Sequence, residues 1–520
     1  MTCRFQLAIS AGFMLTITSG QAQVFQDRTV PQVPGERRAM VTVPLNGIPR
    51  SRVEVWLHYS DNPSDLANPN TVPRGRASCR TISNGNLRCE FIFPHGDHPT
   101  PNILTRTEVN GGEPPSDRPT LIEHQIAVTQ FLAGLGPVPA TVLTDHNPKR
   151  IGSPDTVYYR WVRIVTGPGS STTNDVERSF RMPRRYIVVN IGDSYAAGEG
   201  SPNRDLTDTD NEPMWNDTPC HRSEESGQAR GVRAVIQRTP QAAITFANFA
   251  CSGAISRNLT HETQSIDPTP LDPLNRRTPN GSVQRTPQLD RLETWMADNN
   301  RNHVDVMLLS VGGNDAGFGE VALRCLINVT SDCRNDPQVL ARISSGLSTL
   351  PSRLNAVKND IESRPFRVHR VLHFGYPDPT RDATGSFCGP SVPASQTCWG
   401  PLERTISTAD FAFIFNSFLV PLNTALSQFA TTTNQNRVDR TPRWTFTETA
   451  SLSRTRGLCN CSNGFFHTAG QSLSVQGDLL GTAHPNRRGH REAYQVRTED
   501  FLSSQIRSLL RDSILEQVGN

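Results

Sequence analysis

The residues best able to do chemistry are a serine, a glycine, an asparagine and a histidine, spread over the C-terminal two thirds of the chain. Ser194 lies in the turn Gly192-Asp-Ser-Tyr-Ala-Ala-Gly-Glu-Gly200, directly after an apolar run. Gly253 follows a second such run, Asn314 follows a third, and His484 precedes the last helical pattern. A serine hydroxyl becomes a nucleophile when a base takes its proton, and an acyl-transfer intermediate needs N–H donors around its oxyanion. The set indicates a serine hydrolase that acts through an acyl-enzyme.

The expected role of each residue follows from its place in the chain. In an open α/β sheet, ligands bind at the carboxyl ends of the strands. We therefore expect Ser194 as the nucleophile and His484 as the general base. The N–H groups of Ser194 and Gly253 and the side-chain amide of Asn314 would form the oxyanion hole. Such a mechanism requires no metal and no organic cofactor, and the G-x-S-x-G motif of α/β-hydrolases does not occur.

Together these motifs resemble the SGNH hydrolases, the GDSL-type lipases and esterases, from about residue 186 to about residue 510. The family's first block is matched by Gly192-Asp193-Ser194 and its GxND block by Gly312-Gly-Asn314-Asp315. Gly253 and His484 match its glycine and histidine blocks. The resemblance implies the same four roles, and esters as the substrate class.

One position departs from the family pattern. The histidine block usually carries an aspartate three residues before the histidine, and here that position is Gly481. An acid there would orient the imidazole and stabilise its cation. The carbonyl of Gly481 could accept the ring N–H, Asp478 could reach the ring if the loop bends, or the dyad could work without a third member. We expect the carbonyl.

The segments that must position these residues have the hydrophobic pattern of a parallel sheet with helices between its strands. Near-continuous apolar runs, typical of strands buried on both faces, alternate with helical patterns. The runs cover 186–191, 244–249, 304–311 and 366–374, and the main helical patterns cover 286–296, 336–363, 408–430 and 489–517. Residues 184–520 are therefore predicted to form a doubly wound, three-layer α/β domain like that of the SGNH hydrolases.

The segment before this domain has a different pattern. Short runs that alternate apolar and polar residues are separated by Pro, Gly, Asn and Asp, which favours a smaller β-rich, sandwich-like domain over 23–183. A short helix could lie within 121–135, and 166–174 is a turn-rich connector. Nothing in this domain points to a chemical role.

The N-terminus and the cysteines both predict export. Residues 1–22 have the basic start, short apolar stretch and small residues of a secretory signal peptide. Ten of the 11 cysteines remain after its removal, an even number suited to disulfides. Close pairs are Cys79/Cys89, Cys325/Cys333 and Cys388/Cys398; Cys220 could meet Cys251, and Cys459 and Cys461 are too close together to pair easily. We expect a secreted or periplasmic protein, and the Cys220-His-Arg-Ser223 segment is most similar to the secreted bacterial branch of the family.

Several other residues are weaker candidates. Asp205, Asp208 and Asp210 are interpreted as a solvated loop, because calcium needs oxygen ligands in a defined order. His490 is interpreted as a structural residue, and His221 as a packing or solvent-facing residue that could line the cleft. Trp215, Tyr376 and Trp399 are ordinary packing residues or shape the acyl pocket.

Charge and hydropathy exclude some partners. Lys+Arg number 52 and Asp+Glu 49, which is too balanced for an electrostatic nucleic-acid binder. No stretch beyond the signal peptide has the length of uninterrupted apolar sequence that a membrane span needs. We expect the protein to be a monomer. The most direct interpretation is a secreted esterase or lipase acting on a lipid or acylated polymer. The alternatives are a carbohydrate O-acetylesterase and a non-catalytic binding protein on a hydrolase fold.

Overall fold

The computed structural model describes residues 26–29, 38–60, 74–82, 86–92, 103–107, 119–124, 156–174, 178–181, 185–206, 213–238, 243–299, 301–327, 332–390, 406–438, 441–460 and 462–505. The chain divides into two compact units, one of Met1–Phe93 with Thr156–Arg181 and one of Pro94–Asp155 with Met182–Asn520. The predicted signal peptide lies outside the described residues.

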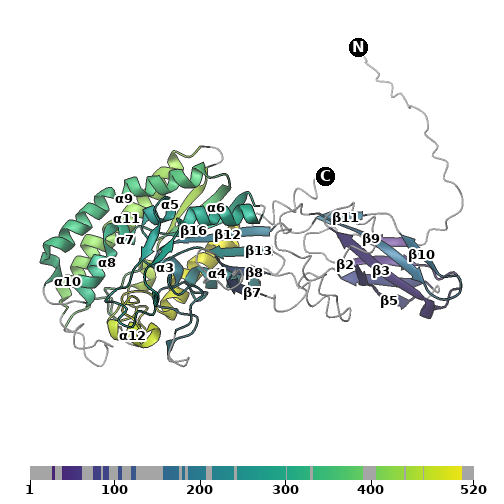
Figure 1. The fold of residues 1–520 in the computed structure, drawn as a ribbon, viewed down its shortest axis with the longest axis horizontal. Coiled ribbons are helices and arrows are strands. Elements are labelled where there is room, and N and C mark those ends of the chain that lie inside the picture. The colour runs from purple at the N-terminus through teal and green to yellow at the C-terminus, as the bar shows by residue number, and fades with distance from the viewer. Residues whose placement is uncertain are drawn as a thin grey trace, which may run out of the picture. The chain divides into compact units, whose positions relative to one another are not determined.

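The N-terminal unit consists of two antiparallel sheets, as the alternating pattern predicted (Figure 1). One sheet has the order β1 (Gln26–Thr29), β2 (Arg38–Val43), β6 (Leu87–Ile92), β5 (Ser78–Thr81). The other has the order β10 (Ser171–Asn174), β9 (Thr156–Val165), β3 (Val53–Ser60), β4 (Arg74–Arg76), with β11 (Arg178–Arg181) also on β9. Alternate residues such as Val53, Val55 and Leu57 are buried, and Trp161 packs among the buried residues. The alternation thus gives each sheet one apolar face.

Two strands within the predicted N-terminal domain belong to the other unit. β8 (Thr120–His124) pairs antiparallel with β13, and β7 (Ile103–Thr107) pairs with β8. Of the predicted helix within 121–135, the structure describes only 121–124, which are strand. Residues 94–155 group with the second unit, whereas the prediction placed them before a single boundary at 183. Antiparallel strands commonly extend an otherwise parallel sheet. β8 joins the sheet through β13, about 120 residues farther along the chain, so the local pattern does not show this pairing.

The second unit is built on a seven-stranded sheet with the order β18-β17-β16-β12-β13-β8-β7. The first five are parallel: β12 (Arg185–Gly192), β13 (Ala243–Asn248), β16 (His303–Ser310), β17 (Arg367–Phe374) and β18 (Arg443–Thr447). If these five strands are numbered by their order in the chain, their order across the sheet is 2-1-3-4-5, which is that of a doubly wound sheet. The order reverses between β12 and β16, so the loops after these two strands form the crevice where such folds bind ligands.

Helices accompany the strands of this sheet and complete the α/β fold (Figure 1). The long ones are α4 (Gly227–Arg238), α6 (Gln288–Asp298), α9 (Pro337–Ser363) and α11 (Val420–Gln435). The C-terminal segment η11 (His490–Gln495) packs on α4. A Cβ at Gly227 would lie 2.2 Å from Cβ of Tyr494, so this contact requires glycine. The predicted fold class, a parallel α/β domain together with a smaller β-rich domain, is confirmed.

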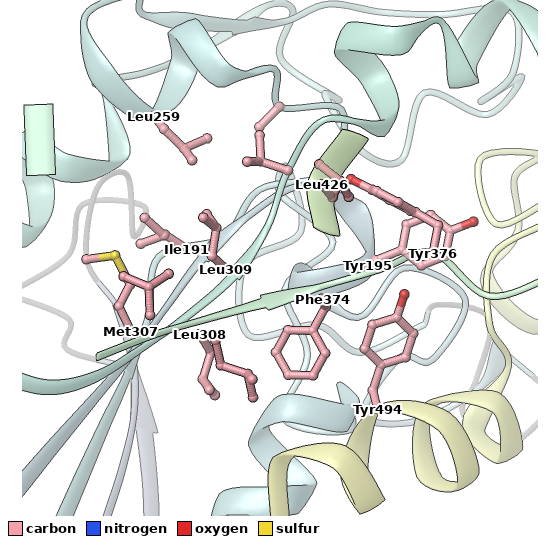
Figure 2. Packing of buried hydrophobic residues seen from close by; sticks show 14 of the residues in the cluster. Ile191, Tyr195, Leu259, Met307, Leu308, Leu309, Phe374, Tyr376, Leu426 and Tyr494 are labelled. Atoms are coloured by element: carbon pink, nitrogen blue, oxygen red, sulfur yellow. The ribbon is translucent and has the colours of Figure 1, made fainter. Parts of the chain in front are cut away.

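The core lies on both sides of the parallel strands and reaches the carboxyl ends where the candidate residues lie. Figure 2 shows Tyr195, Tyr376 and Tyr494 beside Phe374 in this part of the core. The rings of Tyr195 and Tyr376 meet edge to face with centroids 5.0 Å apart. All four side chains are 3% exposed or less, so the core beneath these strand ends is closely packed.

The described residues hold four disulfides. Three predicted pairs are confirmed: Cys79–Cys89, Cys220–Cys251 and Cys325–Cys333. The predicted pair Cys388/Cys398 is wrong, because Cys388 bonds Cys459, 71 residues away. Their loops meet at one short segment, where Cys388 N–H donates to Thr380 O and Leu458 N–H donates to Pro379 O. Cys398 and Cys461 lie outside the described residues.

One helical segment of the described chain, Thr408–Gln435, is long and apolar enough to cross a membrane by length and composition alone. It comprises α10 (Thr408–Phe413), η9 (Ile414–Leu419) and α11. It packs on β18 and α9, with Leu422 and Leu426 fully buried, and 39% of its most apolar window is buried. The core helix of a soluble protein passes the same test, so this feature is weak evidence for a span.

Candidate active site

The turn after β12 presents Ser194. Gly192 has φ +138°, and a Cβ there would lie 2.0 Å from the Ser310 carbonyl oxygen on the neighbouring strand, so only glycine fits. Asp193 then caps the short helix α3 (Ser194–Ala197), its carboxylate accepting from the N–H of Tyr195 at 3.1 Å. Ser194 is the first residue of α3, so its N–H has no partner within the helix. Its hydroxyl and its N–H therefore lie together at the end of the strand.

His484 faces this serine. Its Nε2 lies 2.8 Å from Oγ of Ser194, a hydrogen-bond distance across 290 residues of sequence. The ring packs against Tyr195 and Phe318, with centroids at 5.0 and 5.3 Å, and the Tyr195 hydroxyl donates to the Ala483 carbonyl at 3.2 Å. Burial lowers the pKa of His484 below its ordinary value, so the ring is neutral near pH 7 and Nε2 can accept a proton. This is the geometry of a serine with its base.

The two predicted partners of the oxyanion lie in the neighbouring loops. The loop after β13 is attached to β12 by a hydrogen bond of 3.1 Å from Cys251 N–H to the Gly192 carbonyl. Gly253 in this loop has φ +84°, and its N–H has no acceptor among the described residues. Asn314, in α7 (Gly313–Ala316) after β16, donates one amide hydrogen to the Ala254 carbonyl at 3.0 Å. Its other amide hydrogen remains for a ligand.

Neither predicted orienting residue contacts the histidine ring. The Gly481 carbonyl accepts from the backbone N–H of His484 at 3.0 Å, not from the ring as we expected. Among the described residues Nδ1 of His484 has no partner at full hydrogen-bond geometry, although the backbone carbonyls of Leu480 and Thr482 lie near enough to raise the pKa of the ring. Asp478 also turns away, because its carboxylate accepts from Gln476 Nε2 at 2.6 Å and from Leu480 N–H at 2.8 Å. The backbone turns tightly just before the histidine, with φ +62° at Ala483.

A buried polar cluster that was not predicted from the sequence lies beside the serine and its base. Glu199, five residues after the serine, accepts from Nδ1 of His221 at 2.9 Å. Nε2 of the same ring lies 3.7 Å from the Asp478 carboxylate, and the ring stacks on Trp215 with centroids 4.5 Å apart. His221 is thus buried and held between two carboxylates, and it does not face solvent. The acidic Gly-Glu-Gly200 turn next to the serine was the available signal.

The cluster also has the spacing of metal ligands. Single ligand atoms of Glu199, His221 and Asp478 lie within 4.8 Å of one another, and all three residues are buried. In the described chain these groups are engaged with each other, and the guanidinium of Arg277 contributes a positive charge beside both carboxylates. A cation would compete with that charge and with the ring of His221. The donor set therefore favours the ion-paired form.

Tyr376 is buried beneath the serine turn. Its hydroxyl donates to the Asp193 carboxylate and accepts from Gly313 N–H at 2.8 Å. It thus connects the turn after β12 to the turn after β16. Burial raises the pKa of Asp193 to about 7, against hydrogen bonds from Tyr376, Ser310 and the Tyr195 N–H. Trp399, Asp208 and Asp210 lie outside the described residues.

The chain is similar to a known protein family and to several solved structures. The family described as GDSL-like Lipase/Acylhydrolase matches residues 188–495. Similar solved structures include an extracellular lipase from Streptomyces rimosus, with 20% identity, TM-score 0.38, and coverage of 62% of this chain and 99% of that one. A lipase from a goat rumen metagenome shares 12% identity, with TM-score 0.26 and coverage of 60% and 97%. A carbohydrate esterase shares 10%, with TM-score 0.25 and coverage of 79% and 96%. No match is found among curated protein sequences.

The family match spans more than half of the chain and includes every strand-end loop described above. It begins within β12 and ends within η11, so it takes in both Ser194 and His484. The chain belongs to the GDSL-like lipase/acylhydrolase family.

Proposed function

We propose that this protein is an exported serine hydrolase that cleaves carboxylic esters. The observation that carries the proposal is the 2.8 Å separation between Nε2 of His484 and Oγ of Ser194, in a GDSL-family domain. The predicted signal peptide and the four disulfides favour an extracytoplasmic site of action. A lipid or acylated polymer is the substrate class we favour.

The reaction has two halves. Oγ of Ser194 attacks the ester carbonyl while its proton passes to Nε2 of His484, and the tetrahedral intermediate then expels the alcohol, which takes that proton. Water attacks the resulting acyl-enzyme, with His484 again accepting the proton and returning it to the serine. No cofactor takes part in this scheme.

The negative oxygen of each intermediate needs donors that are already in place. We assign the N–H of Ser194 at the start of α3, the N–H of Gly253 and the second amide hydrogen of Asn314 to this role. Each such donor typically contributes a factor of roughly 10²–10³ in rate. The hydrogen bond from Asn314 to the Ala254 carbonyl supports the assignment, because it holds the amide beside the Gly253 loop.

Nitrophenyl esters of increasing chain length test the proposal. We expect the wild-type protein to release nitrophenol and the Ser194→Ala and His484→Ala variants to lose at least a factor of roughly 10³. Release of acetate from acetylated xylan, with no cleavage of long-chain esters, would instead identify a carbohydrate O-acetylesterase. Absence of turnover on all of these esters by a folded sample would favour the non-catalytic binding protein.

A further inference from the structure

We propose that the buried cluster of Glu199, His221, Gln476 and Asp478 positions His484 and stabilises its cation in place of the missing aspartate. This inference rests on the proposed function, because it assigns a positioning role within the same site. We refer to these four residues as the acid cluster.

The acid cluster is fully enclosed and fully bonded. Glu199 and Asp478 are 0% and 1% exposed, and His221 lies between them at 2%. Gln476 donates to both carboxylates at 2.6 Å, and the Ser252 hydroxyl donates to Glu199 at 2.5 Å. A buried carboxylate with this many donors has a defined position. Glu199 keeps its charge, whereas burial raises the pKa of Asp478 to about 6.

Two sets of hydrogen bonds connect the acid cluster to the loop that carries the base. Gln476 Oε1 accepts from Gly200 N–H at 3.1 Å, and the Gly200 carbonyl accepts from Nε2 of His467 at 2.7 Å. The backbone of His467 then pairs with the base loop, donating to the His484 carbonyl at 3.1 Å and accepting from Ala483 N–H at 2.9 Å. The turn that follows the nucleophile therefore holds the base in register with it.

The acid cluster also explains why residue 481 is glycine. A Cβ at Gly481 would lie 2.7 Å from Oε1 of Gln476 and 2.8 Å from Oγ of Ser472. The side chains that support the cluster thus occupy the space that an aspartate at this position would need. The chain has a buried acid near the histidine, but the acid comes from the serine turn.

The charges in the acid cluster act on the histidine ring. Burial alone would raise the pKa of Glu199, but the charge of His221 and its hydrogen bond hold the pKa well below its ordinary value, so Glu199 stays ionised. Burial lowers the pKa of His484, and the charge of Glu199 is the largest effect that raises it. The other titratable or charged groups around this ring and this cluster are His221, Arg277, His467, Asp478, His490 and Tyr195.

The test is the Glu199→Gln variant, which keeps the shape of the side chain and removes its charge. Without that charge the pKa of His484 falls, so the acid limb of kcat/KM moves to lower pH. The plateau of kcat falls about tenfold for each pKa unit of lost cation stabilisation. Glu199→Asp keeps the charge and should retain the wild-type limb. Glu362→Gln, which removes a surface partner of Lys358, should leave the profile unchanged.

Asp478→Asn is the second variant, and we expect a smaller shift in the same direction. A folded Glu199→Gln variant with the wild-type pH profile would overturn the inference. Loss of folding in both variants would also overturn it, since the acid cluster would then be purely structural. An inactive wild-type protein would instead contradict the proposed function, so the two failures are distinguishable.

Discussion

Asp193, the carboxylate beneath the nucleophile, should make stability depend on pH. It is 1% exposed, and burial raises its pKa from 3.8 to about 7 in the folded protein. The folded state therefore binds this proton more tightly than the unfolded chain does. The free energy of unfolding then falls as the pH rises from about 4 to about 7, and this contribution is constant above that range.

The size of the effect follows from the shift. About three pKa units at 1.36 kcal/mol each give about 4 kcal/mol of stability lost across this range. For a domain of several hundred residues, that corresponds to about 6 °C in Tm. Asp193→Asn has no titrating group at this position. Its Tm should therefore rise relative to that of the wild type by about this amount between pH 4 and pH 8.

Thermal unfolding followed by calorimetry at several pH values measures this difference. Ser310→Ala is the matched control, because it removes a hydrogen bond of 3.0 Å to the same carboxylate but leaves the titrating group in place. We expect a lower Tm for this variant with the pH slope retained. Parallel curves for the wild type and Asp193→Asn, separated by a constant offset, would refute the reasoning.

Two further predictions concern the loops around the site. Removal of the Cys388–Cys459 disulfide by Cys388→Ser with Cys459→Ser should lower the free energy of unfolding by about 4 kcal/mol, because the bond joins residues 71 positions apart. Peptide mapping without reduction should yield a peptide pair linked through Cys388 and Cys459. A peptide pair linked through Cys388 and Cys398 would contradict this pairing. Gly481→Ala should lower the free energy of unfolding by about 1–3 kcal/mol and reduce kcat, because the added Cβ would displace the side chain of Gln476. Unchanged stability and activity would show that the loop tolerates a methyl group at this position.

The sequence allowed the parallel sheet to be predicted because its signals are local. Strands buried on both faces are continuous apolar runs, and the glycines at 192 and 253 fall at the strand ends where a positive φ is needed. The order of these loops in the chain then placed Ser194 and His484 at the same edge, where the structure brings them together.

What could not be predicted depends on distant pairing. β7 and β8 join the sheet through β13, and Cys388 meets Cys459 because their loops bond to the same segment. Gly481 and Asp478 make their hydrogen bonds within the folded loop and not to the histidine ring, which the sequence alone does not show. Glu199 was overlooked because a charged residue between glycines is typical of an exposed turn, and only the folded chain buries it.

The most direct test of the central claim is labelling of the folded protein with a fluorophosphonate probe, with mass spectrometry to locate the adduct. An activated serine reacts covalently whatever its natural ester is. We predict one adduct, on Ser194, that is lost in His484→Ala. A folded sample that gives no adduct, or an adduct on Ser194 that forms equally fast without His484, would contradict the account.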